Sequence, residues 1–213
     1  MAIIQSGADS TLLTIDPTFK AARVVIKPDE LTGAYQLSLT SGALTTVAAN
    51  APIFSFRYAP GTNTVCVVKR VSIGYVATTA FGAAQQMGFG LFVARNFSGS
   101  DSGGNAATLT GNNNKYRTSL ATTAVTDIRI GSTTGLTVGT RTLDSQAIGQ
   151  TFYWVPGVGT SLVQTELISY DANDYPLVLA SGEGFVINNQ VLMGATGVGT
   201  AIVNVEWFEA NAY

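Results

Sequence analysis

Residues 203–207 alternate between apolar and polar side chains, with Val203, Val205 and Trp207 separated by Asn204 and Glu206. A period of two places the apolar side chains on one face of an extended chain and the polar ones on the other. Residues 201–209 therefore predict a strand with one buried face and one solvent face. The apolar run before it, 177–187, is interrupted at 181–184 by Ser-Gly-Glu-Gly. Those glycines predict a tight reversal and hence a hairpin ahead of the closing strand.

Similar patterns recur along the chain and predict an all-β protein. The other expected strands cover residues 22–27, 35–40, 52–58, 64–79, 87–97, 125–130, 150–155 and 162–170. Residues 79–86 are the best helix candidate, but Gly82 and the short length allow one turn at most. About ten short strands with turn residues between them favour a jelly-roll-type β-sandwich of about 8–10 strands.

The longest β-favouring run, 64–79, is expected to bend or to cross between sheets. Its apolar side chains are expected to share one face, and Gly74 is a candidate position for a bulge. The residues assigned to that face are Val65, Val67, Val71, Ile73 and Tyr75.

Two segments depart from the strand pattern. Residues 1–20 are mixed and contain Asp16-Pro17, which disfavours a central strand, so we expect an N-terminal arm followed by a single sandwich domain over 21–213. Residues 98–123 are rich in Gly, Ser and Asn and predict one long loop. Loops of that length in compact domains are usually functional or disordered, which makes this loop the first place to expect a partner surface.

Composition argues against several classes of function. Charged residues make up 11% of the chain, the net charge is -2, and no Lys/Arg cluster occurs, so nucleic-acid binding is not expected. The absence of histidine removes the commonest general base and metal ligand. Cys66 lies among valines and is expected to be a buried, unreactive thiol. We therefore expect no enzymatic activity and no cofactor.

The sequence does not predict a secretion signal or a membrane helix. The first residues lack a basic region followed by a sustained apolar run, so no secretion signal is expected. No stretch approaches the roughly 18 apolar residues of a membrane helix. The chain is expected to be made in a cytoplasm, with no membrane partner.

Several side chains could carry chemistry if the fold brought them together. Paired carboxylates hydrolyse glycosides, but surface positions are the more common place for such residues. The turn 171–174 has three oxygen-bearing side chains, which suit either a partial calcium site or turn hydrogen bonds. Tyr116, between Lys115 and Arg117, could stack on a sugar or a base, or contact a protein neighbour. The candidate carboxylates are Glu166, Glu183, Glu206, Glu209, Asp171 and Asp174.

The segments 6–23, 109–115 and 203–207 resemble uncharacterised proteins encoded among the virion-assembly genes of tailed bacteriophages. The resemblance covers most of the chain but contains no catalytic motif. It implies a structural component of the virion, such as a capsid decoration (cement) protein that contacts the major capsid protein or other virion proteins. A receptor- or glycan-binding head-fibre or tail module with a jelly-roll fold is the alternative.

The analogy with viral jelly rolls further implies a homo-oligomer, with a trimer favoured. The expected contacts lie in the arm and the long loop, because these segments depart from the strand pattern. The predicted interface residues are Leu12, Leu13, Phe19, Asn112, Asn113, Asn114, Lys115, Tyr116 and Arg117.

Overall fold

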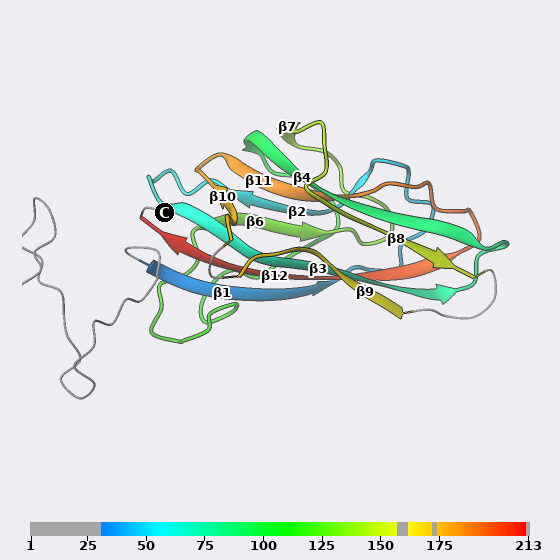
Figure 1. Cartoon of the computed structure of the whole chain (residues 1–213), viewed down its shortest axis with the longest axis horizontal. Helices are drawn as coiled ribbons and strands as arrows, with labels where there is room; N and C mark the ends of the chain where they lie inside the picture. The colour runs from blue at the N-terminus through cyan, green and yellow to red at the C-terminus, as the bar shows by residue number, and fades with distance from the viewer. Residues whose placement is uncertain (1–30, 157–161, 172–173, 212–213) are drawn as a thin grey trace, which may run out of the picture.

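The computed structural model describes residues 31–156, 162–171 and 174–211, and these residues form two antiparallel sheets packed face to face (Figure 1). The described residues contain twelve strands, whereas 8–10 were predicted. They are β1 (Leu31–Thr40), β2 (Pro52–Tyr58), β3 (Val65–Thr79), β4 (Gln85–Gly99), β5 (Asn105–Ala106), β6 (Val125–Ile130), β7 (Thr140–Leu143), β8 (Gly149–Val155), β9 (Leu162–Ser169), β10 (Leu177–Leu179), β11 (Glu183–Asn189) and β12 (Val198–Ala210). The difference comes from two short strands that were not predicted, β5 and β7, and from the segment 177–187, which forms two strands, β10 and β11.

One sheet has five strands and the other has seven. The five-stranded sheet runs β1-β12-β3, and β9 and β10 both pair with the far side of β3. The seven-stranded sheet runs β5-β6-β2-β11-β4, and β7 and β8 both pair with β4. The predicted all-β sandwich is thus confirmed, while jelly-roll connectivity stays a prediction. The predicted arm 1–20 and the strand at 22–27 lie outside the described residues.

The core lies between the two sheets and is built from aromatic side chains that alternate along their strands. Phe56 stacks on Phe185 with ring centroids 4.9 Å apart, and the edge of Trp207 meets Phe56 at 5.4 Å. Tyr35 stacks on Trp207, also at 5.4 Å. Aromatic pairs of this geometry contribute about 0.5–1.5 kcal/mol beyond the area they bury. These contacts join β1 and β12 of one sheet to β2 and β11 of the other.

The strand β12 occupies the middle of the five-stranded sheet, as its alternation predicts. It pairs with β1 on one side and with β3 on the other. Val203, Val205 and Trp207 are buried, whereas Asn204 and Glu206 point to the opposite face. The sequence prediction for this strand is confirmed.

The predicted hairpin at 177–187 is wrong, because its two arms belong to different sheets. β10 pairs with β3, whereas β11 pairs with β2 and β4. The turn between them contains Gly182 at a φ of 86°, a left-handed conformation that glycine adopts without strain. The segment therefore carries the chain from one layer of the sandwich to the other.

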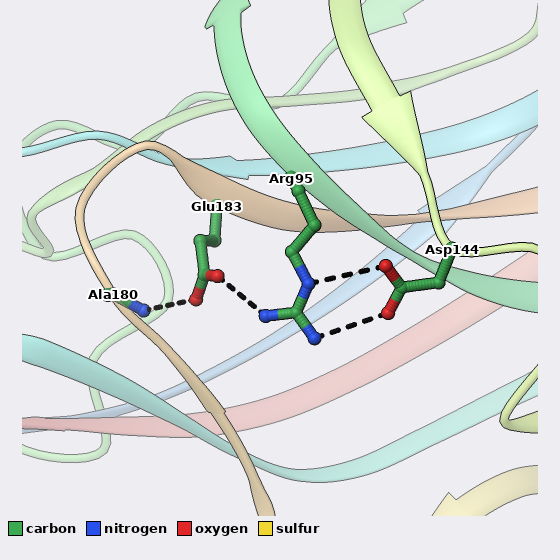
Figure 2. Close-up of polar contacts among 4 residues, drawn as sticks. All are labelled: Arg95, Asp144, Ala180 and Glu183. Carbon is green, nitrogen blue, oxygen red and sulfur yellow. Dashed lines mark hydrogen bonds and ion pairs between the residues drawn. The ribbon is translucent and has the colours of Figure 1, made fainter.

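An ion-pair network fixes this crossing (Figure 2). Arg95 of β4 donates to both carboxylate oxygens of Asp144, at 3.4 and 3.2 Å, and to Glu183 at 2.6 Å. The other oxygen of Glu183 accepts the Ala180 N–H at 2.8 Å. These hydrogen bonds raise the pKa of Arg95, Asp144 contributing most. Glu183 is thus a turn-closing residue.

The face assignment in β3 also needs correction. Glu206 pairs with Arg70 and the next residue, Trp207, pairs with Val68, so Lys69 is an extra residue in the ladder. Such a bulge reverses which side chains face the core. Cys66 and Val68 point inward before it, and the inward positions after it are those of Val71, Ile73 and Tyr75. In its pairing with β12, β3 has extra residues at Lys69 and Thr78 rather than at Gly74. Because of the one at Lys69, Val65 and Val67 do not share the core face.

The predicted helical turn at 79–86 is absent. These residues end β3 and begin β4, and Phe81 between them is buried against the turn at Gly197. The described residues contain no helix, and hence none that is long and apolar enough to cross a membrane. The predicted loop 98–123 is confirmed apart from the end of β4 and the short strand β5.

Candidate functional site

The middle of the outward face of the five-stranded sheet is polar, and its side chains form two cross-strand rows. One row crosses β1, β12 and β3. The other crosses the same three strands and continues to β9. Because outward positions alternate with core positions, the same pattern that buries Trp207 and Val205 places these polar groups on one surface. The first row is Gln36, Glu206 and Arg70, and the second is Ser38, Asn204, Ser72 and Glu166.

The long loop docks on the outer edge of this sheet. The Gln36 N–H donates to the Asn114 carbonyl at 2.8 Å, and the Tyr116 N–H donates to the Ala34 carbonyl at 3.2 Å. Lys115 thereby pairs with Tyr35 as a one-residue antiparallel bridge. The loop thus covers part of the β1 edge, which would otherwise offer unpaired backbone groups to another chain. In Figure 1 the loop lies beside β1.

Tyr116 reaches from this loop onto the polar face. Its hydroxyl donates to Glu206 at 2.8 Å, and the ring stays 47% exposed. Partial burial, followed by the hydrogen bond to Glu206, raises the pKa of Tyr116 to about 12, so the phenol remains a hydrogen-bond donor across the physiological range. Lys69 lies 3.5 Å from the same Glu206 oxygen. Tyr116 is therefore held as an aromatic wall at one end of the polar rows.

Two open hollows lie on this face beside the Tyr116 wall. The first, about 520 Å³, is bounded by Tyr116, Lys115 and Asn114 and has Gln36, Ser38 and Glu206 among the side chains that line it. The second, about 550 Å³, is lined by Arg70, Ser72, Gln164, Glu166 and Asn204. Arg70 and Asn204 line both, so the two hollows are adjacent, and together we call them the groove. Volumes of about 300–1,000 Å³ are usual for sites that bind small molecules.

Short polar contacts order the floor of this groove. Asn204 and Gln164 each donate an amide N–H to the Ser72 hydroxyl, at 3.2 and 3.4 Å. Arg70 lies 3.3 Å from Glu166 in an ion pair whose two side chains are about half exposed. The amide oxygens and the hydroxyl are thus presented from strands rather than from loops, which keeps their spacing fixed.

Glu209 fixes the end of the long loop from inside the sandwich. Its carboxylate is buried and accepts the Thr123 hydroxyl at 2.5 Å and the Ala124 N–H at 2.9 Å. Burial raises the pKa of the Glu209 carboxyl, although these hydrogen bonds oppose the rise. The glutamate has a structural role, because it ties the loop to the last strand.

The other predicted chemical residues have structural places. Cys66 is a buried free thiol whose pKa is raised by burial, as expected for an unreactive cysteine. Asp174 accepts the Asp171 N–H at 2.9 Å, a hydrogen bond within the turn. The part of the chain that the structure describes holds no cluster of three or more His, Cys, Asp or Glu side chains placed for a metal.

The predicted interface residues fall into three groups. Asn114, Lys115 and Tyr116 line the groove. Asn112, Asn113 and Arg117 are exposed in the same loop. Leu12, Leu13 and Phe19 lie outside the described residues. Of the groove residues on the sheet, the sequence singles out only Glu166 and Glu206, as candidate carboxylates. The others have ordinary outward positions in their strands, and only the pairing of strands brings them together.

A second exposed feature lies on the other sheet. We call Phe152 and Trp154 the aromatic patch: they project outward from β8 and are 47% and 68% exposed. The Phe152 ring lies over Gly88 of β4, where a Cβ atom would come within 2.5 Å of it. Glycine at that position lets the ring lie close to the sheet. Tyr153, between Phe152 and Trp154, is buried.

Comparison with known protein families finds no matching family model, and no curated protein matches the chain.

Proposed function

We propose that the protein is a non-enzymatic structural subunit of a tailed-phage particle, most specifically a capsid decoration (cement) protein. In this role it associates with its own copies, a trimer being favoured, and packs on the major capsid protein or another virion protein. Its place of action is the virion, after synthesis in the host cytoplasm. The aromatic patch is the observation that carries this proposal.

The patch has the properties of an assembly contact. Tryptophan and other large aromatics dominate the binding energy of protein interfaces. Phe152 and Trp154 stand on a strand that is hydrogen-bonded to β4, so their positions are fixed before a partner arrives. A preorganised surface loses less conformational entropy on binding.

The charge content supports the same role. With 11% charged residues, the subunit has few ions that would lose hydration when it is packed among neighbours. Four of the candidate carboxylates have structural contacts: Glu183 closes a turn, Glu209 anchors a loop, and Glu166 and Glu206 take part in ion pairs on the sheet surface.

The test is the location and copy number of the protein in purified particles of the phage that encodes it. Quantitative mass spectrometry and electron microscopy of wild-type heads are expected to find it at regular lattice positions on the capsid. The double variant F152S/W154S is expected to fold, as judged by circular dichroism, and to be missing from the heads. Absence of the wild-type protein from the particle, or its presence in a few copies on the tail alone, would refute the proposal.

A further inference from the structure

We infer that the groove on the five-stranded sheet binds a neutral oligosaccharide, with the Tyr116 ring stacked on one sugar unit. The inference does not depend on the position of the protein in a particle. It corresponds to the glycan-binding alternative considered from the sequence, now with a defined site.

The groove offers the hydrogen-bonding groups that sugar hydroxyls need. Gln36, Asn204 and Gln164 each carry one acceptor oxygen and one donor NH₂ group, and Ser38 and Ser72 add hydroxyls. Neighbouring strands lie about 4.8 Å apart, so these groups form a regular grid across the sheet. A sugar hydroxyl both donates and accepts, and it matches such a mixed grid better than an ion or an apolar ligand does.

Tyr116 supplies the apolar element of the site. One face of a pyranose ring presents C–H groups, which pack against an aromatic ring, while its edge presents hydroxyls. Tyr116 is 47% exposed, and its hydroxyl is held by Glu206 at 2.8 Å, which restrains the ring at the side of the groove. An aromatic ring beside planar amide side chains fits a ligand with both kinds of surface.

The charged side chains that line the groove are Arg70 and Lys115 against Glu166 and Glu206, so the lining carries no net charge and favours a neutral ligand. Arg70 is paired with Glu166 at 3.3 Å, and Lys69 is paired with Glu206 at 3.5 Å. An acidic ligand would have to compete with these carboxylates, and a basic ligand would have to compete with their partners. A hydroxyl can add hydrogen bonds to the charged groups without separating either pair.

The extent of the groove favours several sugar units. The two hollows, about 520 and 550 Å³, meet at Arg70 and Asn204 and span strands from β1 to β9. Four strands cover about 14 Å from the first to the last, at about 4.8 Å per step. This span exceeds a single sugar ring, and no loop residue lines the hollow at the β9 end.

The experiment uses the full chain on an array of neutral glucans, galactans, mannans and rhamnans of four or more sugar units, followed by titration calorimetry with the best of them. We expect Tyr116→Ala and Ser38→Tyr to weaken binding at least tenfold. Ser38→Tyr fills the groove without altering Tyr116. Tyr116→Phe, which keeps the ring, is expected to stay within about threefold of wild type. Tyr175→Ala, at an aromatic residue that is 96% exposed and lines neither hollow, is the matched control and is expected to bind as wild type does.

Three outcomes would overturn the site: no binding of wild type to any neutral glycan on the array, binding of acidic glycans only, or equal binding by wild type and both groove variants. Thermal unfolding of each variant, followed by circular dichroism, separates loss of the site from loss of the fold. Failure of this test leaves the proposed virion role intact, because that role is based on the aromatic patch and is tested by the composition of the particle.

Discussion

Thr123 donates its hydroxyl to the buried carboxylate of Glu209 at 2.5 Å, which joins the end of the long loop to the end of the last strand. The same carboxylate accepts the Ala124 N–H, at 2.9 Å from one oxygen and 3.0 Å from the other. Trp207 of the core lies 3.4 Å from it through its indole N–H. One buried side chain thus connects the core, the strand β12 and the loop that carries Tyr116.

The first prediction concerns the pH dependence of stability. Burial raises the pKa of Glu209 above its ordinary value of 4.5, so the folded chain holds this proton at a higher pH than the unfolded chain does. The contribution of Glu209 to stability is therefore greatest below pH 4.5 and is lost as the pH rises through the raised pKa. Glu209→Gln, which keeps an acceptor oxygen but has no charge, is expected to be at least as stable as wild type at pH 8. Urea unfolding of both proteins from pH 4 to pH 8 measures the effect.

The control for this prediction is Glu209→Ala. This variant leaves the Thr123 hydroxyl and the Ala124 N–H without their acceptor, and a buried unpaired polar group costs about 1–3 kcal/mol. We expect a loss of about 2–3 kcal/mol at every pH, together with faster hydrogen exchange at the amides of Gln36 and Tyr116, which join β1 to the loop. If Glu209→Gln is as unstable as Glu209→Ala at pH 8, the buried charge is not the unfavourable element.

The second prediction concerns an ion pair outside the main core. Arg141 of β7 contacts Asp101, and their side chains are only 1% and 0% exposed. Asp101 also accepts the Gly139 N–H at 2.8 Å, and the Arg141 guanidinium lies over the Phe97 ring at 5.1 Å. Burial lowers the pKa of Arg141 to about 10, which still leaves it charged at neutral pH. Asp101→Asn leaves that charge buried without a counterion, and a loss of about 3–5 kcal/mol in the free energy of unfolding is expected.

The matched control is Asp144→Asn in the Arg95 network. The Arg95 and Asp144 side chains are 43% and 41% exposed, and Glu183 remains as a second partner for Arg95. Exposed pairs contribute about 0–1 kcal/mol, so this variant is expected to lose less than about 1 kcal/mol. Equal losses for the two variants in urea unfolding would show that burial does not set the strength of the Asp101 pair.

Local pattern was sufficient to predict most strands, and β3 shows where it fails. The segment 125–130 was expected as a strand and forms β6 with those bounds. Alternation assigned the correct faces in β12, where no residue interrupts the period. In β3 the extra residue Lys69 shifts the period by one, and a bulge of this kind depends on the pairing with β12, which local sequence does not reveal.

The candidate site was predictable only in part, for a related reason. Tyr116 was marked from the sequence because it is an aromatic residue inside a polar loop. Its partner Glu206 lies 90 residues further along the chain, and Gln36 lies on a strand whose neighbour is the C-terminal one. The groove exists only once β1, β12, β3 and β9 are aligned side by side, and single-strand patterns carry no information about that order.

The last prediction tests the close packing of β11 between its two neighbours. A Cβ atom at Gly184 would lie 2.1 Å from the Phe56 carbonyl oxygen and 2.9 Å from the Phe97 ring. The carbonyl belongs to the backbone of β2, so it cannot move without disturbing the sheet. We expect Gly184→Ala to lower the free energy of unfolding by about 2–3 kcal/mol, measured by urea denaturation.

Gly61→Ala is the control, because Gly61 has a φ of 72° with nothing within 4 Å of its Cβ position. That variant is expected to lose about 1 kcal/mol, from backbone strain alone. A Gly184→Ala protein as stable as the Gly61→Ala protein would mean that β2 and β11 separate more easily than their packing indicates.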